Sequence, residues 1–143
     1  MHALCELVRQ YGPLAGRILI TALFLVSGYH KIIGFSAVSG MMAKMGMPLP
    51  DLLLVGAIVC EIGGGLMVLL GWHACWGALL LVIFTIPATL MFHNFWAVGP
   101  ADYQNQFNHF MKNLVIIGGL LYIMAMGSGP YSLKKEGAST SAH

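Results

Sequence analysis

One acidic residue lies deep within a long apolar stretch of the sequence. Glu61 stands about nine residues into the run from Leu52 to Leu70, which is roughly 13 Å from its start if the run is helical. A carboxyl group surrounded by apolar residues must be protonated, paired with a cation or open to water, because an isolated charge is costly there. Glu61 therefore indicates a site that handles protons or a ligand, with a structural hydrogen bond as the alternative.

A second set of polar residues falls on one stripe of the apolar run from Leu14 to about Ile33. Ionisable residues in such runs usually face neighbouring helices, so we expect the stripe to turn inward and Leu19, Leu23 and Val26 to turn outward. Snorkelling of the two cations to lipid headgroups is the alternative. Steps of four, three, four and three residues place on this stripe Arg17, Thr21, Phe24, Gly28 and Lys31.

The remaining candidate side chains flank the third and fourth apolar runs. In an antiparallel arrangement, the end of the third run and the first turns of the fourth meet the end of the first run, close to Glu61. We predict Glu61, His93 and Lys112 as catalytic residues, while ordinary interface contacts of the histidine and snorkelling of the lysine stay open. The predicted ligand-binding residues are Arg17, Lys31, Asn94, Trp96, His109 and Asn113.

Familiar catalytic motifs are absent from the sequence. It contains no Gly-x-Gly-x-x-Gly, phosphate-loop or His-Glu-x-x-His motif, and the glycines of 63–65 lie inside an apolar run, where they indicate close helix packing. A haem or metal held by His93 and His109 is a weak alternative, because no thiolate or carboxylate set accompanies them. Copper(I) bound by the methionines of 41–47 is another. We predict no metal site.

The composition indicates a membrane protein. Of the 143 residues, 58% are hydrophobic and 8% are charged, and the mean hydropathy is +0.80; a soluble domain carries about 25% charged residues. The net charge is +2, and the scattered lysines and arginines form no stripe for nucleic acid. The three cysteines include no Cys-x-x-Cys pair and predict no disulfide framework.

Four apolar runs are long enough to cross a bilayer as helices. Because the runs are continuous and not alternating, strands are a poor alternative, and we predict an all-α membrane protein with a four-transmembrane-helix bundle. The first run is too long for a signal peptide, and we expect it to be retained. The predicted spans are Leu14 to Ile33, Leu52 to Leu70, Cys75 to Phe95 and Phe110 to Met126. The predicted segments are an N-terminal segment (1–13), the transmembrane domain (14–131) and a disordered tail (132–143).

The segment between the first two spans has the pattern of a short interfacial helix. Its apolar residues from Ala37 to Met45 would share one face and lie on the membrane surface. The distribution of lysines and arginines slightly favours cytoplasmic termini, because four of them lie on the side of the termini and three on the other. We therefore predict a multi-pass protein with both termini in the cytoplasm.

The sequence also resembles a known family. Five stretches follow one another in the order of the DoxX family: RILITALFLVSGYHKIIGF, MGMPLP, CEIGGGLMVLLGW, FHNFW and HFMKNLVIIGG. The resemblance covers nearly the whole chain, from about Arg17 to Tyr131. It implies a small four-helix protein of the cell inner membrane. Some members are subunits of quinol oxidase or thiosulfate–quinone oxidoreductase systems, or of a complex that handles thiol and superoxide stress.

Together these features predict an inner-membrane subunit of a quinone-linked redox or oxidative-stress system. It would bind a quinone-like or small polar ligand between its helices near Glu61, His93 and Lys112. No redox centre of its own is apparent, so electrons would come from a partner or a bound cofactor. Whether the chain is an enzyme stays open, and we expect it in a homo-oligomer or a larger membrane complex. A non-catalytic assembly subunit and a small solute or metal transporter are the alternatives.

Overall fold

The structure, a computed structural model, describes residues 1–134 of the chain, and its regular elements are helices. Four of these helical stretches are long and apolar enough to cross a membrane. The predicted all-α membrane architecture is therefore confirmed. The four stretches are His2–Ile33, Pro50–Leu70, Ala74–Ala97 and Pro100–Met126.

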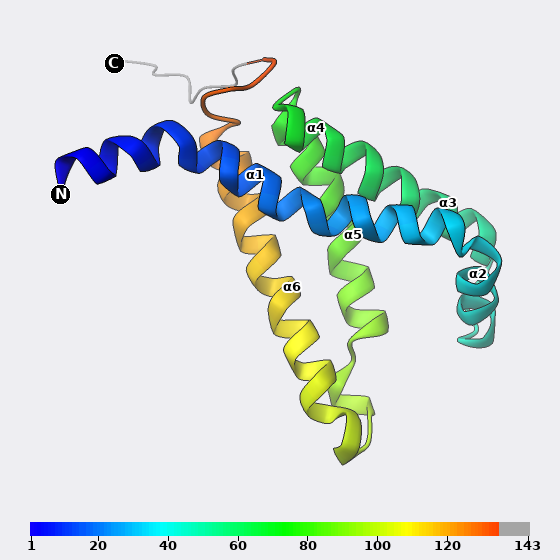
Figure 1. The fold of residues 1–143 in the computed structure, drawn as a ribbon. Coiled ribbons are helices and arrows are strands. Elements are labelled where there is room, and N and C mark those ends of the chain that lie inside the picture. Colours follow the sequence, from blue (N-terminus) through cyan, green and yellow to red (C-terminus); the bar gives the residue numbers. More distant parts are fainter. Residues whose placement is uncertain (135–143) are drawn as a thin grey trace, which may run out of the picture.

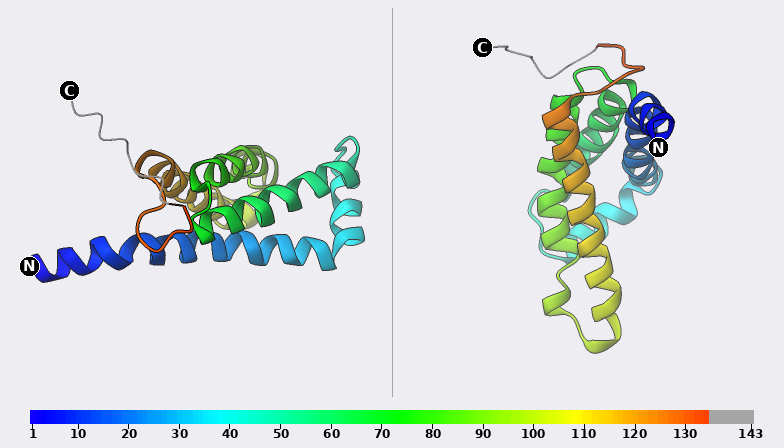
Figure 2. Two further views of the ribbon diagram at one scale, coloured as in Figure 1. Left: turned by 90° about the horizontal axis from the view of Figure 1, so that it is seen from above. Right: turned by 90° about the vertical axis from the view of Figure 1, so that its left-hand side faces the viewer.

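The four stretches form two antiparallel pairs that diverge from each other (Figure 1). Helix α1 (His2–Ile33) lies beside the second span, which consists of α3 (Pro50–Ile58), η1 (Val59–Gly64) and α4 (Gly65–Leu70). Helices α5 (Ala74–Phe92) and α6 (Pro100–Met126) form the other pair. The views of Figure 2 show that the turn between α5 and α6 lies far from α2 (Phe35–Lys44). The two helix pairs are therefore farthest apart at this end of the molecule.

Helix α1 is longer than the sequence indicated. It begins at His2, so the predicted N-terminal segment 1–13 continues the first span as a helix that includes Pro13. The prediction started at Leu14 because it counted only the apolar run. Polar residues before Leu14, such as Glu6 and Arg9, are good helix formers, and they carry α1 beyond the apolar part of the span.

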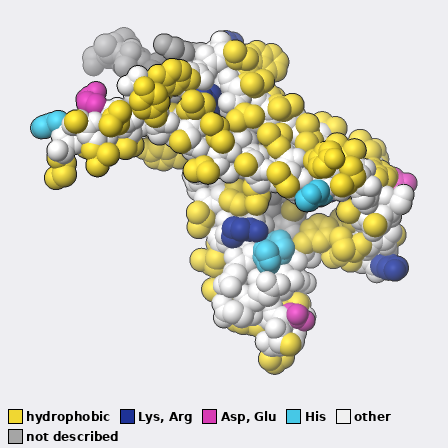
Figure 3. Space-filling view, viewed as in Figure 1, with side chains coloured by type: hydrophobic (Ala, Val, Ile, Leu, Met, Phe, Trp, Pro, Cys, Tyr) yellow, Lys and Arg dark blue, Asp and Glu magenta, His cyan; other side chains and the backbone are white. Residues whose placement is uncertain are grey.

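The stripe predicted on α1 faces the interior. Arg17, with an exposed fraction of 1%, and Thr21, Phe24 and Gly28 are buried, while Leu19 on the opposite side is 75% exposed. Phe24 joins a core cluster whose other members come from α4, α5 and α6: Val68, Ala78, Leu81, Val82 and Leu120. Hydrophobic side chains cover most of the outer surface of α1 in Figure 3, as expected for a surface in contact with lipid.

The predicted interfacial helix is present as α2. It leaves α1 after Gly34 and buries Ser39 and Met42. The hydroxyl group of Ser39 donates a hydrogen bond to the carboxylate of Asp51, in the first turn of α3. This contact fixes α2 across the ends of α1 and α3.

The ends of the third and fourth spans differ from the prediction. Helix α5 ends at Phe92, and a short 3-10 helix, Phe95–Ala97, follows it. Helix α6 begins at Pro100, ten residues before the predicted Phe110, because polar residues such as Gln104 and Asn108 extend the helix before the apolar run begins. We expected three site residues in the first turns of the fourth helix. The structure instead places them inside α6: His109, Lys112 and Asn113.

The beginning of the predicted disordered tail is bound to the helices. The backbone N–H groups of Leu133 and Lys134 donate to the carbonyl oxygens of Leu70 and Gly71, at distances of 3.0 and 3.1 Å. The prediction for this part, based on its small polar residues, missed these backbone partners. The rest of the predicted tail, 135–143, lies outside the described residues.

Candidate functional site

Glu61 lies in the irregular part of the second span. The segment Val59–Gly64 is a π-helix, with ordinary α-helix before and after it. Such π-helical turns inside α-helices often occur at functional sites, because they change the direction of the side chains around them. The carboxyl group of Glu61 is 2% exposed, so it needs a partner.

Lys31 of α1 is that partner. Its Nζ atom lies 2.9 Å from Oε2 and 3.1 Å from Oε1 of Glu61, and it donates to Oγ of Ser27 at 2.7 Å. The same ammonium group lies 5.7 Å from the ring centroid of Phe84, which is within the range of a cation–π contact. By depth in the membrane, the sequence offers Arg17, Lys31 and Lys112 as possible partners of Glu61, and only Lys31 pairs with it.

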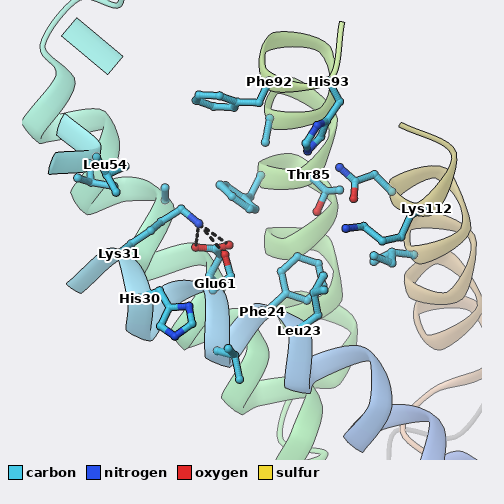
Figure 4. Close-up of a pocket in the computed structure, with 18 of the residues that line it drawn as sticks. Leu23, Phe24, His30, Lys31, Leu54, Glu61, Thr85, Phe92, His93 and Lys112 are labelled. Carbon is cyan, nitrogen blue, oxygen red and sulfur yellow. Dashed lines mark hydrogen bonds and ion pairs between the residues drawn. The ribbon is translucent and has the colours of Figure 1, made fainter. Parts of the chain in front are cut away.

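The ion pair lines a cavity of about 750 Å³ between the two helix pairs. Figure 4 shows Lys31 and Glu61 on one side of it, with His93, which directly follows α5, and Lys112 of α6 on the other. Most of the remaining wall is apolar, including Leu54 and Met42. This volume and this mixture of an apolar wall with a few polar groups are typical of small-molecule sites.

Two histidines and a lysine form a connected group on the side opposite the ion pair. Nδ1 of His93 lies 2.9 Å from Oε1 of Gln106, and the ring of His93 stacks on that of His109 with centroids 4.9 Å apart. Nζ of Lys112 lies 3.1 Å from Nδ1 of His109. Because the lysine must donate, Nδ1 of His109 accepts and its Nε2 carries the hydrogen in the neutral ring. In the same way Nδ1 of His93 donates to the carbonyl oxygen of Gln106.

Asn113 is fixed to α5 through a hydroxyl group. Its Nδ2 atom donates to Oγ1 of Thr89 at 2.9 Å, and Thr89 donates to the carbonyl oxygen of Thr85 at 2.6 Å. Asn113 and Thr85 both line the cavity. The contact between Asn113 and Thr89 therefore holds α5 and α6 together at the cavity wall.

The structure brings together five of the nine predicted site residues. Two predicted binding residues lie outside the cavity lining. His109 contacts His93 and Lys112, which both line the cavity, whereas Trp96 packs on Phe110, with ring centroids 5.9 Å apart. The residues that line the cavity are Lys31, Glu61, His93, Lys112 and Asn113.

Arg17 and Asn94 are not part of the cavity wall. Asn94 precedes the short helix Phe95–Ala97. Arg17 holds the C-terminal segment: its Nη1 donates to Oγ of Ser132 at 3.0 Å, and its Nη2 donates to the carbonyl oxygens of Pro130 and Tyr131 at 3.2 and 2.8 Å. The prediction that Arg17 binds a ligand gains no support from this position.

Three residues that contact the predicted site residues were missed in the sequence. Ser27 lies four residues before Lys31, so its spacing could have placed it on the same helix face. Phe84 and Gln106 carried no such signal, because their roles depend on contacts between different helices. Among residues 1–134, no group of three or more His, Cys, Asp or Glu side chains is arranged to hold a metal ion.

The fold and this site define a small polytopic membrane protein with an ion-paired carboxylate beside an apolar cavity. The family model of DoxX matches residues 12–94, more than half of the chain. The chain therefore belongs to the DoxX family.

Two bacterial relatives support the same conclusion. The chain is 36% identical to the inner membrane protein YqjF of Escherichia coli strain K12, covering 90% of this chain and 93% of the relative. It is 32% identical to the inner membrane protein YphA of the same organism, covering 86% and 88%. With its four spans, the chain is a multi-pass inner-membrane protein.

A eukaryotic protein shows a weaker similarity. The chain is 28% identical over 130 residues to the Surfeit locus protein 4 homolog of Schizosaccharomyces pombe, covering 90% of this chain but 38% of that protein. No solved structure matches the chain.

Proposed function

We propose that the cavity between the two helix pairs binds a quinone-like molecule, and that the chain serves as a membrane subunit of a redox or oxidative-stress system. The observation that carries this proposal is the ion pair of Glu61 and Lys31 in the wall of a largely apolar cavity of about 750 Å³. A quinone has a ring with oxygen atoms at opposite ends and an apolar tail. Such a cavity offers polar groups to the ring and an apolar surface to the tail.

The polar groups of the wall fit such a ring. Nζ of Lys31 is a hydrogen-bond donor for a ring carbonyl oxygen. Oε2 of Glu61 is buried and, besides its ion pair, accepts no hydrogen bond from the described residues, so it can accept one from a ring hydroxyl group. The cavity wall therefore contains a donor and an acceptor within 2.9 Å of each other.

The opposite wall offers a second pair of groups. Since Nδ1 of His93 donates to Gln106, Nε2 of the neutral ring is free to accept a hydrogen bond, and Lys112 adds a donor. A bound quinone supplies the two-electron chemistry. The residues of this chain bind and orient the ring, exclude water with their apolar neighbours, and exchange protons at Glu61 and His93.

Electrons must then come from a partner. The chemistry of the cavity residues, which are carboxylate, ammonium, imidazole and apolar groups, supports proton transfer and binding and not electron storage. This favours a subunit that offers a quinone site to a second protein. A non-catalytic assembly subunit would share the fold but would not need the polar groups of the cavity.

Lipid extraction tests the proposal. The protein is purified in a mild neutral detergent, and its quinone content per protein molecule is measured by chromatography and mass spectrometry. We expect quinone well above the level carried by an unrelated four-helix membrane protein purified in the same way. We expect Glu61→Gln to lose most of it.

The matched control is Lys44→Gln, which removes an exposed lysine of α2 that does not line the cavity. This variant should retain the quinone content of the unmodified protein. No enrichment of quinone in the unmodified protein, under conditions in which it stays folded, would refute the proposal.

A further inference from the structure

The cavity carries an uncompensated positive charge. Among its lining residues, Lys31 and Lys112 are cationic and Glu61 is the single carboxylate. That carboxylate is already paired with Lys31, because both of its oxygen atoms lie within 3.1 Å of Nζ of Lys31. Lys112 is therefore left without an acidic partner in the cavity.

The partner that Lys112 does have is neutral. Its Nζ atom lies 3.1 Å from Nδ1 of His109, a lone-pair acceptor that satisfies one N–H group without cancelling the charge. Figure 3 shows Lys or Arg and His side chains side by side on the surface formed by α6. His93, which stacks on His109, adds another imidazole to this group and no acidic one.

Lys112 is an exposed residue, but the direction of its side chain argues against simple snorkelling. A snorkelling lysine extends away from the bundle toward the headgroups. In Figure 4 the side chain of Lys112 instead points from α6 toward Thr85 of α5, and it lines the cavity. When apolar groups of a ligand displace water from this cavity, the ammonium group loses solvation and needs an anionic oxygen in its place.

We infer that the cavity has an anion subsite at Lys112, which takes the acidic headgroup of an amphiphile, a phosphate or a carboxylate on an apolar chain. The ammonium group of Lys112 binds the anionic oxygen. The chain of the amphiphile lies along the apolar wall near Ile116 and Phe24. This subsite does not require the proposed quinone.

Binding of dodecyl phosphate tests the inference. The purified full-length protein, in a neutral detergent, is titrated with dodecyl phosphate and with dodecanol, and binding is followed by native mass spectrometry and by the shift in Tm. We expect dodecyl phosphate to bind at least about tenfold more tightly than dodecanol, since a charge-assisted hydrogen bond is lost with the alcohol. Inorganic phosphate, which has no chain, should bind far more weakly than dodecyl phosphate.

Variants at Lys112 separate charge from packing. Lys112→Gln should bind dodecyl phosphate about tenfold or more weakly and should bind dodecanol as tightly as the unmodified protein does. Lys112→Arg should retain most of the affinity for dodecyl phosphate. Lys44→Gln is the control and should bind as the unmodified protein does. A mixture of phosphatidylglycerol and phosphatidylcholine identifies the source: selective binding of phosphatidylglycerol assigns the subsite to a bilayer lipid, and its exclusion assigns it to a free single-chain acid.

Two results would overturn the inference. One is equal affinity for dodecyl phosphate and dodecanol, and the other is a Lys112→Gln variant that binds dodecyl phosphate as tightly as the unmodified protein. Neither result affects the quinone content on which the proposed function depends. Failure of the quinone proposal, in turn, leaves the dodecyl phosphate titration unchanged.

Discussion

Gly28 of α1 packs directly against Ile62 of the π-helical segment. A Cβ atom at position 28 would lie only 2.7 Å from Cδ1 of Ile62 and 3.4 Å from Cβ of Glu61. The absence of a side chain at Gly28 thus lets α1 approach the second span closely, one turn before Lys31. This approach brings the ammonium group of Lys31 to the carboxylate of Glu61.

A large side chain at position 28 should separate the two spans. We expect Gly28→Leu to lower the free energy of unfolding by about 1–3 kcal/mol, the usual cost of overpacking, and to reduce the quinone content of the purified protein. Thermal unfolding in detergent measures the first effect. Gly118→Leu on α6 is the control, because a Cβ at Gly118 meets no atom within 4 Å. Equal Tm values for the two variants would show that the close contact at Gly28 is unimportant.

Replacement of Glu61 should separate its two roles. Glu61→Gln removes the ion pair but keeps hydrogen bonding, and we expect a loss of about 1–3 kcal/mol in the free energy of unfolding. The loss stays moderate because the Lys31 side chain is 23% exposed and can turn toward water. Glu61→Leu removes the ion pair and the hydrogen bonding, and we expect it to be less stable than Glu61→Gln. Should both variants keep their fold, their quinone content and their cellular phenotype, Glu61 is only a tolerated structural carboxyl group.

Arg17 should control the C-terminal segment and not the cavity. Arg17→Lys keeps the charge but cannot reproduce the three hydrogen bonds to Pro130, Tyr131 and Ser132. We expect at least tenfold faster amide hydrogen exchange in residues 127–134, a lower Tm and an unchanged quinone content. Arg9→Lys, at an exposed position of α1, is the control. Loss of quinone from a folded Arg17→Lys variant would instead support the prediction that Arg17 belongs to the ligand site.

The orientation of the chain in the membrane can be tested at Cys5, an exposed residue near the start of α1. With Cys60 and Cys75 replaced by alanine, a membrane-impermeant maleimide should label Cys5 only after cell lysis, because we predict cytoplasmic termini. A second variant, Asn105→Cys without Cys5, carries its thiol near the turn between α5 and α6. This thiol should react in intact spheroplasts. The reverse pattern of labelling would invert the predicted orientation.

The sequence determined the spans and the inward face of α1, because both are local properties. Twenty consecutive apolar residues specify a spanning helix whatever surrounds it, and steps of three and four specify one helix face. The stripe of Arg17, Thr21, Phe24 and Gly28 is therefore buried as predicted. The deep position of Glu61 likewise singled out a residue that the structure buries in the wall of the cavity.

The partners of these residues were decided only by the tertiary structure. Arg17, Lys31 and Lys112 were all possible partners of Glu61 by sequence, and the choice among them depends on how the helices rotate and cross. Close packing at Gly28 and the π-helical turn at Val59–Gly64 bring Lys31 to the carboxylate. Arg17 instead donates hydrogen bonds to backbone carbonyl groups of the C-terminal segment. Lys112 lines the cavity between the two helix pairs. Contacts between residues far apart in the chain leave no periodic pattern in the sequence, because they depend on shape and not on local hydrophobicity.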